Sequence, residues 1–124
     1  MPECSVLIVD DDPTILAMLV EILEFEGYPT HTATNGVEAL LEVERCCPAV
    51  VLLDMRMPLL DGWGFAREIQ ERCIVLRILV MTAARDAKAW AAEIHADGYV
   101  SKPFDLDVLV ERVSAIARTL ASSE

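Results

Sequence analysis

One apolar stretch that ends in a carboxylate constrains this chain more than any other feature. Residues 49–53 are all apolar, and Asp54 follows them directly. An uninterrupted apolar run of this length is typical of a strand buried on both faces, as in a parallel sheet covered by helices. Ligands of such sheets bind at the edge where the strands end. We therefore expect Asp54 to lie at a functional edge and to act there as a nucleophile.

Apolar runs and helical patterns alternate along the whole chain. Strands are predicted at residues 4–9, 28–33, 49–53, 75–81 and 98–101, and helices at residues 13–26, 35–46, 63–72, 86–96 and 105–120. Asp12 before Pro13 is typical of a helix start, and Gly27 of a helix end. Five alternations of strand and helix predict an α/β fold with a parallel sheet covered on both faces. We expect one domain over residues 1–124.

Charge and composition exclude several classes of protein. The net charge of −11 opposes binding to nucleic acids or anionic membranes, and it suits a protein that holds a cation or docks on a basic partner. No apolar run approaches the roughly 18 residues of a membrane span, so no membrane insertion is expected. The N-terminus lacks the basic flank of a signal peptide, so a cytoplasmic location is expected.

Cysteine and histidine residues show no metal-binding spacing. The chain has no C-x-x-C pair among its four cysteines, which are Cys4, Cys46, Cys47 and Cys73. A zinc site is therefore not expected, and the cysteines are predicted to be buried or half-buried free thiols. His31 and His95 do not follow a predicted strand next to Asp54, so we expect them to be solvated or capping side chains.

Chemically useful groups follow four of the five predicted strands. They are Asp10 and Asp11 after the first strand, Asp54 after the third, Thr82 after the fourth and Lys102 after the fifth. Helical crossovers bring all these strand ends to one edge of the sheet. The sequence therefore predicts that residues up to 92 positions apart meet in one shallow pocket.

The chemistry of this set indicates phosphoryl transfer. Three neighbouring carboxylates repel one another, and a divalent cation removes that repulsion. Carboxylate, carbonyl and water oxygens suit Mg²⁺, which readily takes a phosphoryl oxygen as a further ligand. Asp54 is predicted to attack phosphorus and to form an acyl phosphate. Mg²⁺ and Lys102 then neutralise the charge of the transferred group, and Thr82 donates its hydroxyl to a phosphoryl oxygen.

Several motifs together resemble response-regulator receiver domains of the single-domain chemotaxis-regulator type. Each is weak alone, but their order and spacing along the entire chain are specific. They are Val9-Asp10-Asp11-Asp12, Asp54-Met55-Arg56-Met57-Pro58 with Asp61-Gly62, Met81-Thr82-Ala83, and Gly98-Tyr99-Val100-Ser101-Lys102-Pro103-Phe104. The resemblance implies a flavodoxin-like, doubly wound (βα)5 fold with strand order 2-1-3-4-5.

The same resemblance implies roles for individual residues. Asp54 would accept a phosphoryl group from the phosphohistidine of a sensor histidine kinase or of a phosphotransfer protein. Mg²⁺ would be held by Asp11, Asp54 and the backbone carbonyl of Arg56, with Asp10 acting largely through water. Thr82 and Tyr99 would form a switch pair, and the Lys102–Pro103 peptide bond would be cis.

Such a domain would be no enzyme beyond catalysing its own phosphorylation and dephosphorylation. It would act through an unknown downstream protein, as a monomer or as a phosphorylation-dependent dimer. Two departures from the family pattern concern the output surface. The segment from Thr82 to Tyr99 is about two residues shorter than in many receivers, which shortens the fourth helix or its leading loop. The usual glycine before the fifth strand is also replaced, with His95 near that place.

Three other functions compete with this interpretation. Residues 10–14 fit the D-x-D-x-T signature of haloacid-dehalogenase-type phosphatases, but 124 residues is short for that fold and the Asp54 motif is left unexplained. A receiver that only docks, without phosphorylation, usually lacks one of the acidic, threonine or lysine positions, which are all present here. A flavodoxin is disfavoured because the acidic loop after the first strand lacks the residues that bind a flavin phosphate.

Overall fold

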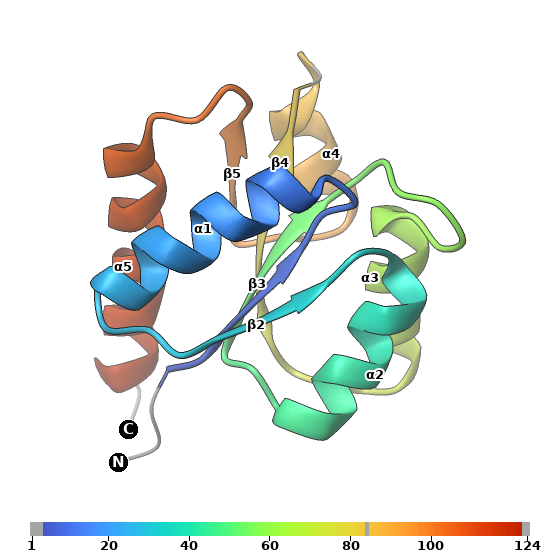
Figure 1. The fold of residues 1–124 in the computed structure, drawn as a ribbon. Helices are drawn as coiled ribbons and strands as arrows, with labels where there is room; N and C mark the ends of the chain where they lie inside the picture. The colour runs from blue at the N-terminus through green and yellow to red at the C-terminus, as the bar shows by residue number, and fades with distance from the viewer. Residues whose placement is uncertain (1–3, 84, 123–124) are drawn as a thin grey trace.

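A computed structural model describes residues 4–83 and 85–122 of the chain, and five strands alternate with five helices in these ranges (Figure 1). The strands are β1 (Val6–Val9), β2 (Thr30–Ala33), β3 (Val50–Asp54), β4 (Arg77–Thr82) and β5 (Gly98–Ser101). The helices are α1 (Pro13–Phe25), α2 (Gly36–Cys46), α3 (Gly62–Glu71), α4 (Ala87–Glu93) and α5 (Leu106–Ser122).

The strands form one parallel sheet in the order β2-β1-β3-β4-β5. This confirms the predicted α/β class and the flavodoxin-like strand order. β1 and β3 are buried at every residue, as their uninterrupted apolar sequences predict. All five strands end at the same edge, so the loops that follow them surround a common site.

Helices cover both faces of the sheet and enclose two apolar cores (Figure 1). α1 and α5 pack on one face, against alternate strand residues such as Ile8 and Leu52. α2, α3 and α4 pack on the other face, against Leu7 and Leu53 among others. Because successive strand residues point to opposite faces, β1 and β3 each supply both cores.

Side-chain caps fix where three helices begin. Asp12 accepts a hydrogen bond from the Thr14 backbone N–H at 2.9 Å, as predicted for the start of α1. Asn35 is the cap of α2 and accepts the Glu38 backbone N–H at 2.9 Å, and the Glu38 side chain accepts the Thr34 N–H at 2.8 Å. Asp61 caps α3 through the Gly64 N–H at 2.8 Å. All three caps follow loops at the carboxyl edge and hold those loops in place.

The loop after β3 folds back closely on the strand. The Gly62 N–H donates to the Met55 carbonyl at 2.9 Å. A Cβ atom at Gly62 would come within 2.8 Å of the Met55 Cα and 2.5 Å of its sulfur. Only glycine allows this approach, so Gly62 determines the path of the residues that follow Asp54.

The segment around α4 departs most from the sequence prediction. A helix was expected over residues 86–96, but α4 ends at Glu93 and has seven residues. His95 follows with a φ of +56°, the left-handed region that ends helices and that glycine adopts most readily. Asp97 then accepts the Ile78 backbone N–H at 2.8 Å and joins this turn to β4.

Across the described ranges, none of the helices combines the length and the apolar character that crossing a membrane requires.

Candidate functional site

Sheet register places two predicted site residues side by side. Val9 of β1 pairs with Leu53 of β3, so Asp10 and Asp54, the next residues, leave the sheet next to each other. Both are buried, whereas Asp11 is exposed at the start of the following loop. Carboxylate oxygens of Asp10, Asp11 and Asp54 all lie within 4.8 Å of one another. The structure therefore brings together the acidic residues that the sequence placed on two separate strands.

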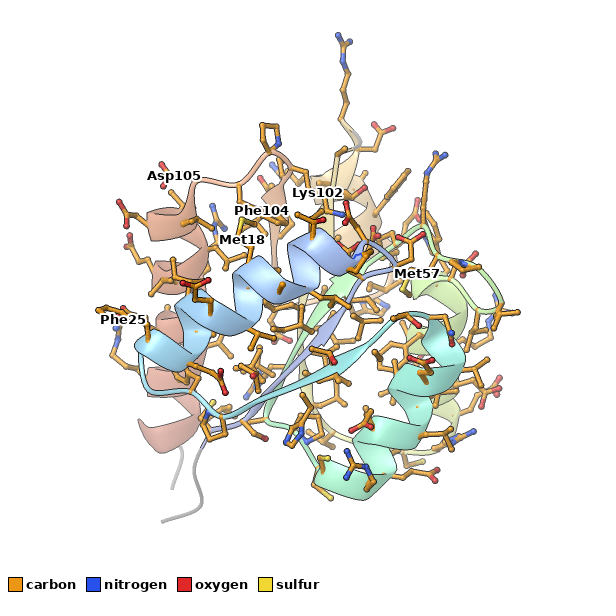
Figure 2. The ribbon with its side chains drawn as sticks, in the orientation of Figure 1. Met18, Phe25, Met57, Lys102, Phe104 and Asp105 are labelled. Atoms are coloured by element: carbon orange, nitrogen blue, oxygen red, sulfur yellow. The ribbon has the colours of Figure 1, made fainter. Side chains whose placement is uncertain are left out.

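Lys102, which directly follows β5, also lies next to this cluster. Its Nζ lies 2.7 Å from Asp10 Oδ2 and 3.6 Å from Asp54 Oδ2. The peptide bond from Lys102 to Pro103 is cis, the conformation that the resemblance implies. The Lys102 backbone N–H also donates to the Thr82 carbonyl at 2.9 Å. Figure 2 shows Lys102 and Met57 at the same end of the sheet, beside the loops after β5 and β3.

Asp10 is the more deeply enclosed of the two buried carboxylates, with a side chain that is 0% exposed. Its Oδ1 accepts the Asp12 backbone N–H at 2.9 Å, and its Oδ2 accepts Lys102. Burying a charge is costly unless it is paired and hydrogen-bonded, and Asp10 has both kinds of partner. Asp10 thus holds the lysine in place as well as contributing an oxygen to the cluster.

Asp54 has an altered proton affinity. Burial raises its pKa from 3.8 to about 6. The Lys102 ammonium and the Arg56 backbone N–H, 3.4 Å from Oδ1, oppose this change, whereas the charges of Asp10 and Asp11 reinforce it. Burial and like charges therefore prevail over the single nearby cation. A further cation at this position would favour the ionised, nucleophilic form.

The oxygen cluster fits the coordination chemistry of Mg²⁺. This cation prefers carboxylate, carbonyl and water oxygens, and two oxygens bound to one Mg²⁺ lie at most about 4.2 Å apart. The oxygens of the cluster lie within 4.8 Å, so small side-chain adjustments bring them to that spacing. Arg56 lies two residues after Asp54, at the position from which its carbonyl is predicted to contribute.

Thr82 and Tyr99 occupy different surroundings. Thr82 is buried at the end of β4, where its carbonyl receives the Lys102 N–H. Tyr99 lies in β5 and pairs with Val80 of β4. Thr82 pairs with Ser101, which is two residues farther along β5. The half-buried Tyr99 ring packs against the core under α4, and the Arg112 guanidinium carbon lies 5.5 Å from the ring centroid. The structure thus places Thr82 at the site and Tyr99 farther along the neighbouring strand.

An aromatic pair connects the loop after Asp54 to α4, which sequence reasoning did not foresee. The Arg56 guanidinium carbon lies 5.2 Å from the centroid of the Trp90 ring. Trp90 and Trp63 meet edge to face with centroids 4.7 Å apart, and Trp63 Nε1 donates to Glu93 at 2.7 Å. The sequence left Trp90 open between packing on the sheet and exposure on a docking face, and it is half-buried. Nothing in the spacing of these residues indicated the contact.

The cysteines and His31 differ in part from the sequence prediction. All four thiols are free, but Cys47 and Cys73 are exposed and only Cys4 and Cys46 are half-buried. His31 was expected to be a solvated or capping side chain. It is half-buried instead, with Nδ1 3.5 Å from Cys46 Sγ.

Comparison with known proteins agrees with this fold. The model of the response regulator receiver domain family matches residues 6–114. The chain belongs to the response regulator receiver domain family and is the receiver domain of a two-component response regulator.

Curated relatives include transcriptional regulators. PhoP of Bacillus subtilis, an alkaline phosphatase synthesis transcriptional regulatory protein, is 36% identical over 116 residues, which are 92% of this chain and 48% of that protein. The response regulator MprA of Mycobacterium leprae is 39% identical over 115 residues, 91% of this chain and 50% of that protein. The chain therefore spans about half the length of each of these relatives.

Solved structures of similar fold include a chemotaxis protein and a response regulator. The chemotaxis protein CheY4 of Vibrio cholerae is 27% identical with a TM-score of 0.84, and the match covers 93% of this chain and 99% of that chain. The response regulator TrrA of Thermotoga maritima, solved in complex with Mg²⁺-BeF, is 37% identical with a TM-score of 0.81. That match covers 90% of this chain and 97% of that chain.

Proposed function

We propose that this domain accepts a phosphoryl group on Asp54 in an Mg²⁺-dependent reaction and thereby changes a surface that a partner protein binds. The observation that carries the proposal is the convergence of Asp10, Asp11 and Lys102 on the Asp54 carboxylate. These groups are those that phosphoryl transfer to a carboxylate requires, namely a nucleophile, oxygens for a divalent cation and a fixed cation. The Mg²⁺-BeF complex of TrrA, at 37% identity, supports the same metal here.

In the proposed step, an Asp54 carboxylate oxygen attacks the phosphorus of a phosphohistidine on the phosphodonor. The new bond is an acyl phosphate P–O bond, and the bond that breaks joins phosphorus to the imidazole nitrogen. The electron pair of that bond stays on the imidazole, which then takes a proton. Hydrolysis by water later returns the Asp54 carboxylate and inorganic phosphate. In this reaction the domain catalyses only its own phosphorylation and dephosphorylation.

The residues around Asp54 have separate roles in this proposed reaction. Mg²⁺ bound by the acidic cluster would neutralise charge on the phosphoryl oxygens. Lys102 supplies a second positive charge, and the Asp10 carboxylate fixes its position. The Thr82 hydroxyl, at the neighbouring strand end, donates to a phosphoryl oxygen once the group is present. Tyr99, the second member of the switch pair, would move inward together with Thr82 when the phosphoryl group is present.

Partners follow from the reaction. A receiver domain implies a phosphodonor, here a sensor histidine kinase or a phosphotransfer protein. The recipient of the signal is a downstream protein that binds one of the two states, and the receiver acts as a monomer or a phosphorylation-dependent dimer. Phosphorylation shifts the equilibrium between these states by adding charge beside the Arg56 loop.

The phosphatase alternative is disfavoured by the geometry of the first loop. Its D-x-D-x-T signature would need Asp12 as a second catalytic carboxylate. Asp12 instead caps α1 through the Thr14 N–H, and both residues are exposed. A docking-only receiver is disfavoured because the acidic cluster and Lys102 are complete.

Phosphorylation can be tested directly on the purified domain. With Mg²⁺ and a small acyl-phosphate donor, we expect the intact mass to rise by one phosphoryl group, because bound Mg²⁺ would favour the ionised, nucleophilic form of Asp54 at the sheet edge. Asp54→Asn should abolish the addition, and chelation of the metal should prevent it. Asp12→Asn is the matched control, since it removes the same charge and keeps a helix cap. Equal labelling of wild type and Asp54→Asn would contradict the proposal.

Tryptophan fluorescence should report the occupied site. Trp63 and Trp90 are the two tryptophans of the chain, and they lie together beside Arg56. Addition of Mg²⁺ and beryllofluoride is expected to change their emission, because ligands at Asp54 reposition the Arg56 loop. The change should disappear in Asp54→Asn and decrease in Arg56→Ala, but remain in Arg118→Ala on α5. An unaltered response in Arg56→Ala would show that the contact with Trp90 does not transmit the change.

A further inference from the structure

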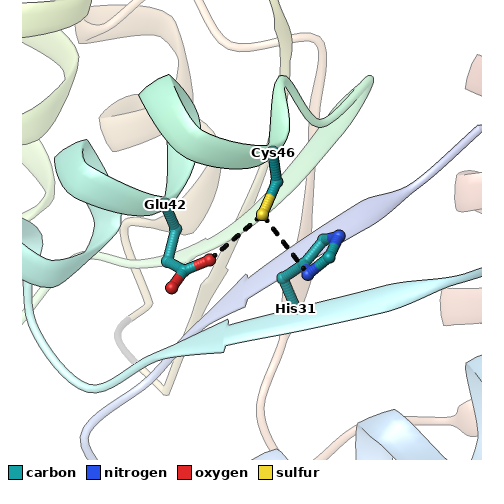
Figure 3. A group of neighbouring side chains, drawn as sticks. All are labelled: His31, Glu42 and Cys46. Atoms are coloured by element: carbon teal, nitrogen blue, oxygen red, sulfur yellow. Dashed lines mark hydrogen bonds between the residues drawn. The ribbon is translucent and has the colours of Figure 1, made fainter.

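The side chains of His31, Glu42 and Cys46, three residue types that can bind metals, meet between β2 and the end of α2 (Figure 3). Cys46 Sγ lies 3.5 Å from His31 Nδ1 and 3.3 Å from Glu42 Oε2. The donor atoms of these three residues lie within 4.8 Å of one another, and each side chain is half-buried. The cluster has no part in the chemistry proposed for Asp54.

Sheet and helix geometry explain why the cluster escapes a search for sequence spacing. His31 lies on β2, an edge strand of the sheet. Glu42 and Cys46 are four residues apart near the end of α2, so their side chains share one face of that helix. α2 runs back from the carboxyl edge after β2, and its last turn therefore returns to the residues near the start of β2. The metal-ligand pattern depends on this packing, not on a C-x-x-C motif.

The distances match those between ligands of a tetrahedral zinc ion. With Zn–S near 2.3 Å and Zn–N or Zn–O near 2.1 Å, two ligand atoms of one Zn²⁺ are roughly 3.6 Å apart. The two distances from Cys46 Sγ, 3.5 and 3.3 Å, lie within a few tenths of an ångström of that value. Two of the three separations thus already have nearly the required value, and the third, between His31 and Glu42, lies within 4.8 Å.

We propose that His31, Glu42 and Cys46 bind one Zn²⁺, with water in the fourth position. A thiolate and an imidazole select a borderline-soft cation over Mg²⁺, which prefers oxygen, and a carboxylate completes the set. Binding replaces the thiol proton that Cys46 now donates to Glu42, so Zn²⁺ enters, an S–Zn bond forms and one proton is released. The thiolate and carboxylate then balance both charges of the cation.

Neighbouring groups are compatible with this arrangement. Arg45 contacts both oxygens of Glu42, at 3.0 and 2.7 Å, and its side chain is 68% exposed. When Oε2 binds the metal, Oε1 can keep its bond to Arg45 and orient the carboxylate. The Cys46 thiol donates to Glu42 Oε2 at 3.3 Å, and this is the proton that Zn²⁺ would displace. The bound ion would fasten the edge strand β2 to the last turn of α2.

Metal binding is tested by titrating Zn²⁺ into the reduced domain with excess Mg²⁺ present, which occupies the Asp54 cluster. We expect one Zn²⁺ per chain and a rise in the midpoint of thermal unfolding, because the metal binds only the folded arrangement. Co²⁺ in place of Zn²⁺ should give the near-ultraviolet charge-transfer band of a cobalt thiolate. Cys46→Ser should abolish this band, and His31→Ala and Glu42→Gln should weaken Zn²⁺ binding at least about tenfold.

Cys47→Ser is the matched control, since Cys47 is the adjacent exposed thiol at the end of α2. It should leave Zn²⁺ binding and the cobalt band unchanged, as should Asp54→Asn. Far-ultraviolet circular dichroism checks that each variant is folded. Equal Zn²⁺ uptake by wild type and Cys46→Ser, loss of uptake in Cys47→Ser, or a cobalt complex without the thiolate band would each overturn the proposal.

Discussion

Lys102→Ala is expected to slow phosphorylation of Asp54 about 10²- to 10³-fold, the typical loss when one preorganised donor to a transition state is removed. Lys102 Nζ lies 3.6 Å from Asp54 Oδ2, next to where charge develops on the transferred group. We expect bound Mg²⁺ not to replace the lysine fully, because Asp10, Asp11 and Asp54 would hold the metal while Lys102 supplies a second, separate positive charge. The measurement is the rate of phosphoryl incorporation from a small donor at saturating Mg²⁺.

The same substitution should destabilise the metal-free domain by about 3 kcal/mol, the low end of the cost of leaving a buried carboxylate without its partner. Asp10 is fully buried, and among the described residues the Asp12 N–H is the hydrogen-bond donor that remains to it when Lys102 is removed. Urea unfolding with a chelator measures this change. Mg²⁺ should then stabilise Lys102→Ala more than wild type, since it supplies the missing positive charge.

Two variants separate the role of the lysine from a general effect of charge. Lys102→Arg keeps the positive charge beside Asp10 and should retain most of the stability. Lys88→Ala removes an exposed lysine on α4 and should change neither measurement. Wild-type rates in Lys102→Ala would show that the Asp10–Lys102 pair is structural and takes no part in the transfer.

Most of the fold follows from local signals in the sequence. The apolar runs of β1 and β3 indicate strands buried on both faces, and Asp12 marks a helix start that the structure confirms. The adjacency of Asp10 and Asp54 follows from the same logic, because each ends a strand of a parallel sheet. Strand order could not be deduced in this way and came from the resemblance to receivers.

Features that depend on packing between elements could not be predicted. Arg56 reaches Trp90 because the loop fixed by Gly62 turns toward α4, which no spacing along the chain encodes. His31 meets Cys46 because an edge strand and a helix end converge. The early end of α4 coincides with His95, whose left-handed backbone conformation the helical pattern of residues 86–96 does not indicate.

These contacts, which the sequence did not predict, concern the surface that a partner would bind more than the site of phosphoryl transfer. The nucleophile and its helpers lie at strand ends, whose relative positions any parallel α/β sheet fixes. Trp63, Trp90 and Glu93 lie instead on α3 and the short α4. The site can therefore resemble those of other receivers while the surface that α4 presents differs. The fluorescence response of Arg56→Ala examines this connection directly.

Asp54→Asn is expected to stabilise the metal-free domain by about 2 kcal/mol near neutral pH, after allowance for solvent screening. The Asp54 pKa is about 6 in the folded protein and 3.8 in its ordinary environment, so the folded state binds the proton more tightly. The free energy of unfolding of wild type therefore falls as pH rises from about 4 to about 6 and stays lower above that range. Asparagine has no such charge to bury.

The difference between the two proteins should accordingly vanish near pH 4, where Asp54 is protonated in the folded state, and be complete near pH 7. Urea unfolding with a chelator at both pH values measures it, and titrating groups remote from Asp54 cancel in the difference. Asp12→Asn removes an exposed charge and should show no comparable change with pH. At neutral pH, Mg²⁺ should make wild type more stable than Asp54→Asn, because the metal binds the ionised Asp54 and stabilises only wild type strongly. A difference that does not depend on pH would contradict this prediction. It would mean that burying the ionised Asp54 carboxylate beside other negative charges does not destabilise the metal-free domain.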